Sequence, residues 1–281
     1  MSSETSGTSA TPTNPLDRID TSVMHPARRY NYWLGGKDNF EADRESADAI
    51  AAVFPTVRLG ALENRAFLRR AVTYLTREAG IRQFLDIGTG IPTVNNTHEV
   101  AQAIDPRSRI VYVDNDPIVL CHARALLTST PEGATTYIDA DLRQPEKILN
   151  HEELLRTLDL SQPVGLMLIA VMHFIVDSDD PYGILRRLLD ALPTGSYVAI
   201  TNGTSDFVPP EVRAAAATGI TSGQHGVMRL RSRDEFGRFF DGLELASPGI
   251  VSVADWRAED EPQPRPAPAE VSIYGAVARK P

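Results

Sequence analysis

The chain lacks the features that would place it in a membrane, in an oxidising compartment or on nucleic acid. Its single cysteine, Cys121, can form no internal disulfide, so we expect a reducing compartment, the cytoplasm. No apolar run approaches the roughly 20 residues of a membrane helix, and the N-terminus has no apolar signal core. Lys and Arg number 28 against 37 Asp and Glu, a net charge of −9, whereas nucleic-acid binding needs basic patches. We therefore expect neither a membrane nor a nucleic-acid partner.

Two further absences narrow the chemistry. No group of Cys, His, Asp and Glu has the spacing of metal ligands, so no metal site is predicted. The dinucleotide pattern G-x-G-x-x-G is also incomplete, because Gly88 and Gly90 are followed by Ile91, Pro92 and Thr93 rather than by a third glycine. A nicotinamide-dependent oxidoreductase on a related sheet is thus a disfavoured alternative.

The remaining pattern alternates strands and helices. Residues 1–20 are rich in Ser, Thr and Pro and are expected to be disordered, and the proline-rich, acidic residues 258–270 are expected to form a loop. Expected helices are 41–54, 62–79, 94–104, 117–128, 146–157 and 181–191, and expected strands are 82–87, 109–113, 135–138, 164–171 and 196–201, with a C-terminal antiparallel pair at 243–247 and 272–278. This alternation predicts an α/β fold with a doubly wound, mostly parallel sheet that is covered on both faces.

The first of these strands ends in a glycine turn at residues 84–90. An apolar run leads to Asp86, and Gly88 and Gly90 follow it one residue apart. Glycines let the backbone turn tightly and approach a ligand closely, because no Cβ stands in the way. The sequence therefore predicts a ligand at the end of this strand.

A second apolar strand, residues 111–113, ends in Asp114, Asn115 and Asp116, with Asp114 placed 24 residues after Gly90. Nucleotide-binding folds place a ribose-binding acid at about this spacing. Carboxylates beside the glycines would repel a pyrophosphate but suit a ligand with an ammonium group, a sulfonium and no phosphate. This charge pattern favours S-adenosylmethionine over a nicotinamide dinucleotide.

Several blocks together resemble class I methyltransferases, and more narrowly a bacterial family of S-adenosylmethionine-dependent methyltransferases of unknown substrate. The blocks that carry the resemblance are residues 28–40, 64–70, 81–90, 114–116 and 139–142. The resemblance runs from about Val23 to Lys280, nearly the whole chain. It implies a Rossmann-like methyltransferase sheet of seven strands, the last of them antiparallel.

The resemblance also implies roles for the residues at the first two strand ends. Gly88 and Gly90 would approach the methionine part of the cofactor, and Asp86 would anchor its ammonium group directly or through water. Asp114 would accept hydrogen bonds from the ribose hydroxyls, with Asn115 near the adenine. The alternative for both acids is that each caps the following helix.

The acidic turn that follows the third strand would hold the base. The resemblance implies that Asp141 contacts the adenine amino group and the backbone of Leu142 the ring edge, with Asp139 as the rival for the first role. Asp116 directly precedes Pro117, so a role as the N-cap of the next helix explains it as well as a role in the site does. Pro92 stiffens the glycine turn and predicts a helix that starts at about Thr93.

Residues 21–80 are interpreted as an N-terminal helical lid over residues 81–281, which form the Rossmann-like core of a single-domain protein. Aromatic rings attract cations such as a sulfonium, and in residues 28–40 the rings alternate with polar groups, which core packing would not require. We expect Tyr30, Tyr32 and Asn39 to contact the cofactor. The alternative is an apolar set of lid residues that closes one end of the core.

His173 follows the apolar fourth strand, where open α/β folds bind their ligands. It is the candidate catalytic base, although methyl transfer is a direct displacement in which positioning can supply most of the rate. The alternative is a histidine that is hydrogen-bonded near the cofactor without proton chemistry. Further candidates for the border of the acceptor are Thr201, Asn202, Gln224, His225 and Arg229.

These observations predict an S-adenosylmethionine-dependent methyltransferase that acts on a small-molecule acceptor. The absence of an unambiguous base leaves one alternative of another class, a non-catalytic sensor that binds the same cofactor and regulates a partner. One fold hosts many functions, so the fold does not decide between them.

Overall fold

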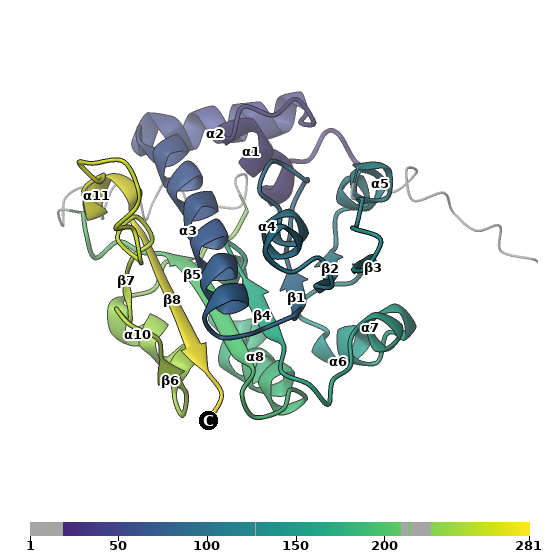
Figure 1. The fold of residues 1–281 in the computed structure, drawn as a ribbon. Helices are drawn as coiled ribbons and strands as arrows, with labels where there is room; N and C mark the ends of the chain where they lie inside the picture. The colour runs from purple at the N-terminus through teal and green to yellow at the C-terminus, as the bar shows by residue number, and fades with distance from the viewer. Residues whose placement is uncertain (1–18, 127, 209–212, 214–225) are drawn as a thin grey trace, which may run out of the picture.

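A computed structural model describes residues 19–126, 128–208, 213 and 226–281, so the predicted disordered tail lies almost wholly outside the described residues. A single mixed sheet runs through the molecule (Figure 1) in the order β3-β2-β1-β4-β5-β8-β6, and β7 also pairs with β8. Its strands are β1 Gln83–Ile87, β2 Arg109–Asp114, β3 Ala134–Asp139, β4 Gly165–Leu168, β5 Tyr197–Gly203, β6 Glu244–Leu245, β7 Val251–Ser252 and β8 Ile273–Arg279.

The sheet confirms the predicted α/β class and its mostly parallel order. Strands β1 to β5 are parallel, and β8 lies antiparallel between β5 and the two short strands β6 and β7. Eight strands are described instead of seven because β6 and β7 both pair with β8 on the same side of it, as one interrupted strand would. The C-terminal pair was correctly predicted as antiparallel: β6 and β8 pair at one end of the strand order, where β6 is the edge strand.

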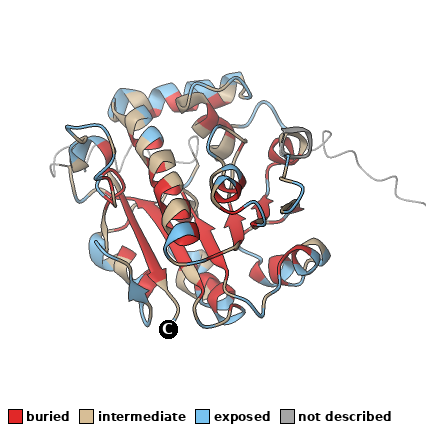
Figure 2. Ribbon diagram, viewed as in Figure 1, coloured by how far each residue is buried: buried red, intermediate tan, exposed pale blue. Residues whose placement is uncertain are grey.

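Helices cover both faces of the sheet. Their bounds are α1 Pro26–Trp33, α2 Glu41–Val53, α3 Val57–Arg77, α4 Thr97–Ile104, α5 Pro117–Leu126, α6 Pro145–Leu149, α7 Glu152–Thr157, α8 Pro181–Asp190, α10 Arg233–Gly237 and α11 Pro268–Val271, with 3-10 turns η2 Met172–Phe174, η3 Asp177–Asp179 and η4 Arg238–Phe240. One apolar cluster joins α3 and α4 to the sheet through Phe67, Leu75 and Phe84. The opposite cluster joins α6, α7, α8 and α10 to it through Ile148, Leu188 and Phe236. The central strands β1, β2, β4, β5 and β8 are accordingly almost entirely buried between these layers (Figure 2), whereas β3 is mostly half-buried and β6 is exposed.

Among the predicted bounds that differ from the structure, three differ for local reasons. Strand β4 ends at Leu168 and not at residue 171, because Ala170 has φ +57° and η2 follows. Helix α4 begins at Thr97 and not at Thr93, because Asn95 has φ +60° and Asn96 is the N-cap. The backbone N–H of Asn96 donates to Glu99 Oε2 at 2.8 Å. The predicted helix 146–157 is interrupted near Asn150 and forms α6 and α7. Each break lies at a backbone turn that the apolar periodicity does not record.

The strand order predicts a binding region beyond the carboxyl ends of the central strands. The chain winds outward from β1 to β3 and then returns to β4, so the order reverses between β1 and β4, where open α/β sheets bind ligands beyond their carboxyl ends. Helices α1 and α2 lie beyond these ends and cover them (Figure 1). No helix within the described ranges is both long and apolar enough to span a bilayer.

Candidate functional site

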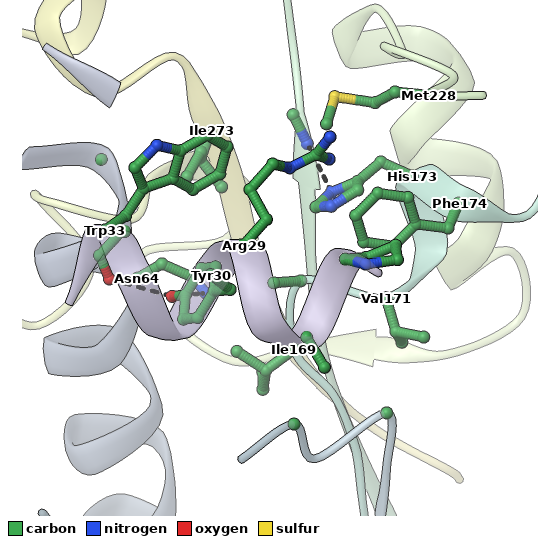
Figure 3. Close-up of a pocket in the computed structure, with 18 of the residues that line it drawn as sticks. Arg29, Tyr30, Trp33, Asn64, Ile169, Val171, His173, Phe174, Met228 and Ile273 are labelled. Atoms are coloured by element: carbon green, nitrogen blue, oxygen red, sulfur yellow. Dashed lines mark hydrogen bonds between the residues drawn. The ribbon is translucent and has the colours of Figure 1, made fainter. Parts of the chain in front are cut away.

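A cavity of about 440 Å³ opens where the order of strands reverses. We divide it into two parts by what lines each. The carboxylate half lies at the ends of β1, β2 and β3 and is lined by Asp86, Gly88, Gly90, Asp114, Asn115, Asp141 and Leu142. The apolar half lies under α1, α2 and α3 and is lined mainly by Trp33, Ile50, Phe54, Val57, Met228 and Ile273, with Arg29 and His173 beside them. Figure 3 shows the apolar half with Val171 near its floor.

The two glycines of the turn are required for different reasons. Both have positive φ, +76° at Gly88 and +66° at Gly90. A Cβ on Gly88 would lie 2.5 Å from Val171 Cγ2, so the missing side chain of this glycine makes room for the segment that follows β4. A Cβ on Gly90 would meet nothing nearer than Ala27 Cβ at 4.0 Å, so the space in front of Gly90 is open. Both glycines line the cavity, and the open space in front of Gly90 fits the predicted close approach of a ligand.

Asp114 joins the turn to the end of β2. Its Oδ2 accepts the Gly90 N–H at 2.8 Å and its Oδ1 accepts the Asp116 N–H at 3.0 Å. A carboxylate offers about four lone-pair positions, so acceptor capacity remains on both oxygens for a ligand hydroxyl. Burial raises the pKa of Asp114, and the two backbone N–H groups oppose that shift.

Asp86 is the most deeply enclosed acid of the carboxylate half. Its Oδ2 accepts a hydrogen bond from Thr97 Oγ1 at 2.6 Å, and burial raises its pKa to about 6. The Thr97 hydroxyl and the positive charge of Arg65 oppose the shift. Arg65 also lines the cavity and donates to Val94 O at 3.0 Å. The sequence analysis missed Arg65 as a site residue, although it lies in the block 64–70 that carried the resemblance.

The acidic turn after β3 brings Asp141 and Leu142 to the cavity. Asn115 Nδ2 donates to Asp141 Oδ2 at 3.1 Å, and Arg143 Nη1 lies 2.9 Å from the same oxygen. Asp139, the predicted rival, is exposed and is not among the cavity-lining residues. The positions therefore favour Asp141 as the acid at this end.

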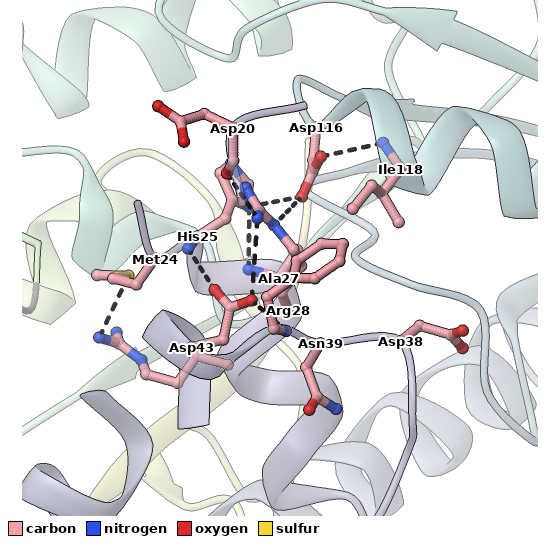
Figure 4. Close-up of polar contacts among 12 residues, drawn as sticks. Asp20, Met24, His25, Ala27, Arg28, Asp38, Asn39, Asp43, Asp116 and Ile118 are labelled. Atoms are coloured by element: carbon pink, nitrogen blue, oxygen red, sulfur yellow. Dashed lines mark hydrogen bonds and ion pairs between the residues drawn. The ribbon is translucent and has the colours of Figure 1, made fainter. Parts of the chain in front are cut away.

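Asp116 lies outside the cavity lining and serves two structural contacts (Figure 4). Its Oδ1 accepts the Ile118 N–H at 3.0 Å, as expected for the cap of α5, and its Oδ2 lies 3.1 Å from Arg28 Nε and 3.0 Å from His25 Nδ1. Arg28 Nη1 lies 3.9 Å from Asp43 Oδ2 on α2. Because the Asp116 N–H also binds Asp114, these contacts connect α1 and α2 to the carboxylate half.

The three aromatic and amide candidates of the N-terminal segment lie in different places. Tyr30 lines the cavity, and its hydroxyl donates to Ala61 O at 2.9 Å and accepts from Asn64 Nδ2 at 3.0 Å. Asn64 Oδ1 is a buried cavity-lining acceptor with no partner among the described residues. The sequence analysis did not single out Asn64.

Tyr32 and Asn39 are not brought to the cavity. The Tyr32 hydroxyl lies 3.3 Å from Asp48 Oδ1, and Arg58 stacks 5.0 Å from the centre of the Tyr32 ring. Asn39 Nδ2 donates to Asn31 Oδ1 and to Gly36 O, both at 3.0 Å, which holds the connection between α1 and α2. The geometry therefore gives both residues a structural place and not the predicted contact with the cofactor.

His173 lies in η2 on the wall of the apolar half. The Gly203 N–H donates to its Nδ1 at 3.4 Å, so the neutral ring carries its proton on Nε2. Burial, together with the positive charges of Arg29 and Arg231, lowers the pKa of His173 to about 3. This ring is neutral at pH 7 and a weak base, which does not favour the predicted role in proton removal.

The other predicted acceptor-border residues support the wall from behind. Thr201 Oγ1 accepts the Ala170 N–H at 2.8 Å, and Asn202 Oδ1 accepts from Arg231 Nη1 at 3.0 Å. Arg229 pairs with Asp177 at 3.0 Å, while its neighbours Met228 and Leu230 line the cavity. Gln224 and His225 lie outside the described residues. Among those described, no three His, Cys, Asp or Glu side chains gather as metal ligands would.

Comparison with known proteins agrees with this geometry. The sequence model of a family described as S-adenosyl methyltransferases matches residues 12–281. A DUF574 family protein from Streptomyces avermitilis is 49% identical, covers 94% of this chain and 100% of its own, and superposes with a TM-score of 0.88. A methyltransferase candidate from Thermobifida fusca is 40% identical, covers 97% and 99%, and has a TM-score of 0.83. A search of curated protein sequences found no match.

Proposed function

The chain belongs to the S-adenosyl methyltransferase family and is an S-adenosylmethionine-dependent methyltransferase, and we propose that its methyl acceptor is a small molecule bound in the apolar half of the cavity. The observation that supports this proposal is the continuity of one cavity from the open space at Gly90 to the apolar side chains beneath α1. A cavity of about 440 Å³ covered by helices suits a small acceptor better than a folded macromolecule.

The residues of the carboxylate half fit the cofactor by charge. An ionised Asp86 would accept from the ammonium group of the methionine part, and Arg65 beside it would balance the carboxylate of that same part. Asp114, already fixed by the Gly90 N–H, would accept from the ribose hydroxyls. Asn115, Asp141 and Leu142 would border the adenine. The cofactor supplies an electrophilic methyl group on a sulfonium, and these residues bind and orient it.

The N-terminal segment 21–80 would cover both ligands. Helix α1 contributes Arg29, Tyr30 and Trp33 to the cavity, and α2 contributes Ile50 and Val53. Such a cover excludes water from a displacement whose rate depends on holding two reactants in line. The single cysteine supports a reducing compartment, the cytoplasm, as the place of action.

Calorimetry with purified protein tests the cofactor assignment. S-adenosylmethionine and its demethylated product S-adenosylhomocysteine should bind, whereas NAD should not, because three carboxylates line the half that a pyrophosphate would occupy. Family membership already disfavours the oxidoreductase and the sensor. Tight binding of NAD without binding of S-adenosylhomocysteine would contradict the proposal.

Turnover tests the acceptor class. Release of S-adenosylhomocysteine should be measured with a cell extract separated by dialysis into small molecules and retained macromolecules. Turnover with the dialysable fraction supports a small acceptor, and turnover only with the retained fraction contradicts it. Binding without turnover in either fraction would favour the non-catalytic sensor.

A further inference from the structure

The apolar half contains buried positive charge but no described carboxylate. Within the part of the chain that the structure describes, the acids that line the cavity are Asp86, Asp114 and Asp141, all in the carboxylate half. In the apolar half the charged lining residue is Arg29, which is 1% exposed, and Arg231 lies buried behind His173. An acceptor that enters this half therefore meets the guanidinium of Arg29 and no described carboxylate in the lining.

The environment of Arg29 keeps its charge near the cavity. Its Nη1 donates to Ser46 Oγ at 3.1 Å, and its guanidinium lies 5.3 Å from the centre of the Trp33 ring. In Figure 3 the side chain reaches from α1 toward His173 and Met228. Asp43 is an acid near Arg29. Its carboxylate accepts hydrogen bonds from the backbone N–H groups of His25 at 2.7 Å and Phe40 at 2.9 Å, and it lies 3.9 Å from Arg28 Nη1.

Arg231 fixes the turn that carries His173. Its Nη1 donates to Met172 O at 2.8 Å and its Nη2 to Ile175 O at 2.7 Å, the carbonyls on either side of the histidine and Phe174. Its acidic neighbour Asp177 lies 3.6 Å away and is largely exposed to solvent. His173 lines the cavity, and because its Nδ1 accepts from the Gly203 N–H, the neutral ring has Nε2–H as a hydrogen-bond donor.

We propose, building on the function proposed above, that the methyl acceptor is an anionic oxygen, a carboxylate or an acidic phenol, on a flat apolar body. Arg29 would provide the countercharge, the Nε2–H of His173 would donate to the oxygen, and Trp33, Phe54 and Ile273 would enclose the apolar body. An ammonium acceptor is disfavoured because the same two arginines would repel it. The assignment gives the apolar half a ligand class and Arg29 a substrate-binding role.

The proposed transfer balances without a base on the protein. A lone pair of the acceptor oxygen forms the O–CH₃ bond, the S–CH₃ bond breaks, and its electron pair stays on sulfur. The acceptor anion and the sulfonium become a neutral ester or ether and neutral sulfur, and the acceptor has already lost its proton to solvent. A neutral product no longer pairs with Arg29, which favours its release.

Binding of charged and neutral probes to the protein saturated with S-adenosylhomocysteine tests the proposal. The probes are 2-naphthoate, 2-naphthamide and 2-naphthylmethylammonium, which share one apolar body and differ in charge. By calorimetry at pH 7.5 we expect naphthoate to bind about tenfold or more tighter than both others. Equal or tighter binding of the ammonium probe would overturn the proposal. Saturation by S-adenosylhomocysteine is measured first, so a failure of the cofactor assignment is seen separately.

Variants then locate the effect. Arg29→Met should reduce the preference for naphthoate to about twofold and leave the affinity for S-adenosylhomocysteine nearly unchanged, while Arg29→Lys should keep most of the preference. The control Arg58→Met removes a guanidinium on α3 that stacks on Tyr32 outside the cavity and should change neither. A large loss of S-adenosylhomocysteine affinity in Arg29→Met would instead assign Arg29 to the methionine carboxylate and overturn the proposal.

A spectroscopic measurement covers the case in which Arg29→Met does not fold. A nitrophenol, whose absorbance reports its ionisation, is added to the wild-type complex at a pH below its own pKa. We expect the bound phenol to be more ionised than the free one, because the positive field stabilises phenolate. Binding with unchanged or suppressed ionisation would overturn the proposal.

Discussion

The two halves of the cavity are built in different ways. The carboxylate half is made of strand ends, where backbone N–H groups fix short acidic side chains. The Gly90 N–H donates to Asp114, and β1 and β2, the strands that lead to these two residues, pair directly with each other. The apolar half is made of helices α1, α2 and α3 and the start of β8. More than 190 residues separate the end of α3 from the start of β8. The carboxylate half is thus local in sequence, whereas the apolar half is assembled by tertiary packing of segments distant in the chain.

Gly88 packs against Val171 where the two halves of the cavity meet, and a substitution that disturbs this packing should have the largest effect on stability. Gly88→Ala places a Cβ 2.5 Å from Val171 Cγ2 at a positive φ, so we expect a loss of about 2–5 kcal/mol in the free energy of unfolding. Urea denaturation measures it. The added variant Val171→Gly should restore much of the loss.

A matched control separates the clash from the backbone strain. Gly242 also has a positive φ of +80°, and a Cβ there meets nothing within 4 Å. Gly242→Ala should therefore cost only about 1 kcal/mol. Equal losses in the two variants would show that the Val171 contact does not matter.

Asp114→Ala should produce the next largest effect, confined to the carboxylate half. We expect the affinity for S-adenosylhomocysteine to fall by about 1–3 kcal/mol through lost charge-assisted hydrogen bonds, and naphthoate binding at saturating S-adenosylhomocysteine to stay nearly unchanged. Asp139→Ala, which removes an exposed acid outside the cavity, is the control. Unchanged cofactor affinity in Asp114→Ala would remove the ribose assignment.

The acidity of Asp86 predicts opposite pH trends for binding and for stability. Its pKa is raised from 3.8 to about 6, so the ionised form that binds an ammonium group is lost as the pH falls through 6. Affinity for S-adenosylhomocysteine should then drop by up to about tenfold per pH unit. In the free protein the raised pKa means that the fold favours the protonated acid, so this group lowers stability as the pH rises from about 4 through 6.

Asp86→Asn provides the comparison for both trends. Calorimetry and urea denaturation between pH 5 and 8 should show weaker binding and a smaller dependence of both quantities on pH. A pH profile of binding identical to that of the wild type would show that another group titrates.

Tyr32→Phe should have the smallest effect. The hydroxyl contacts Asp48 at 3.3 Å on an exposed surface, so we expect changes within about 0.5 kcal/mol in stability and in cofactor affinity. A loss of cofactor affinity beyond that range would restore the sequence-based prediction that Tyr32 contacts the cofactor. Calorimetry with S-adenosylhomocysteine measures it.

The sequence was sufficient for the parts of the molecule that are local. Apolar strands, the glycine turn and the acids at strand ends follow from short patterns, and Asp86, Asp114 and Asp141 all reach the cavity. The prediction gave Gly88 and Gly90 one shared reason, but the contact of Gly88 with Val171 depends on a residue about 80 positions away in the chain. Sequence spacing does not contain that contact.

The N-terminal segment shows where local patterns fail. On one short helix, Tyr30 faces the cavity and Tyr32 faces α2, although both belong to the same motif. Their directions depend on how α1 packs, and the roles of Arg29 and Asn64 depend on the same packing. The low basicity of His173 likewise follows from burial and from Arg231, which is 58 residues away in the chain.

Arg28 and Arg29 are consecutive residues of α1 that reach in different directions, one to Asp116, whose backbone N–H donates to Asp114, and the other into the apolar half. A rigid helix cannot lift one of these side chains without displacing the next. A displacement of α1 that frees the apolar half should therefore also separate Arg28 from Asp116, so we expect the opening of the two halves of the cavity to be coupled.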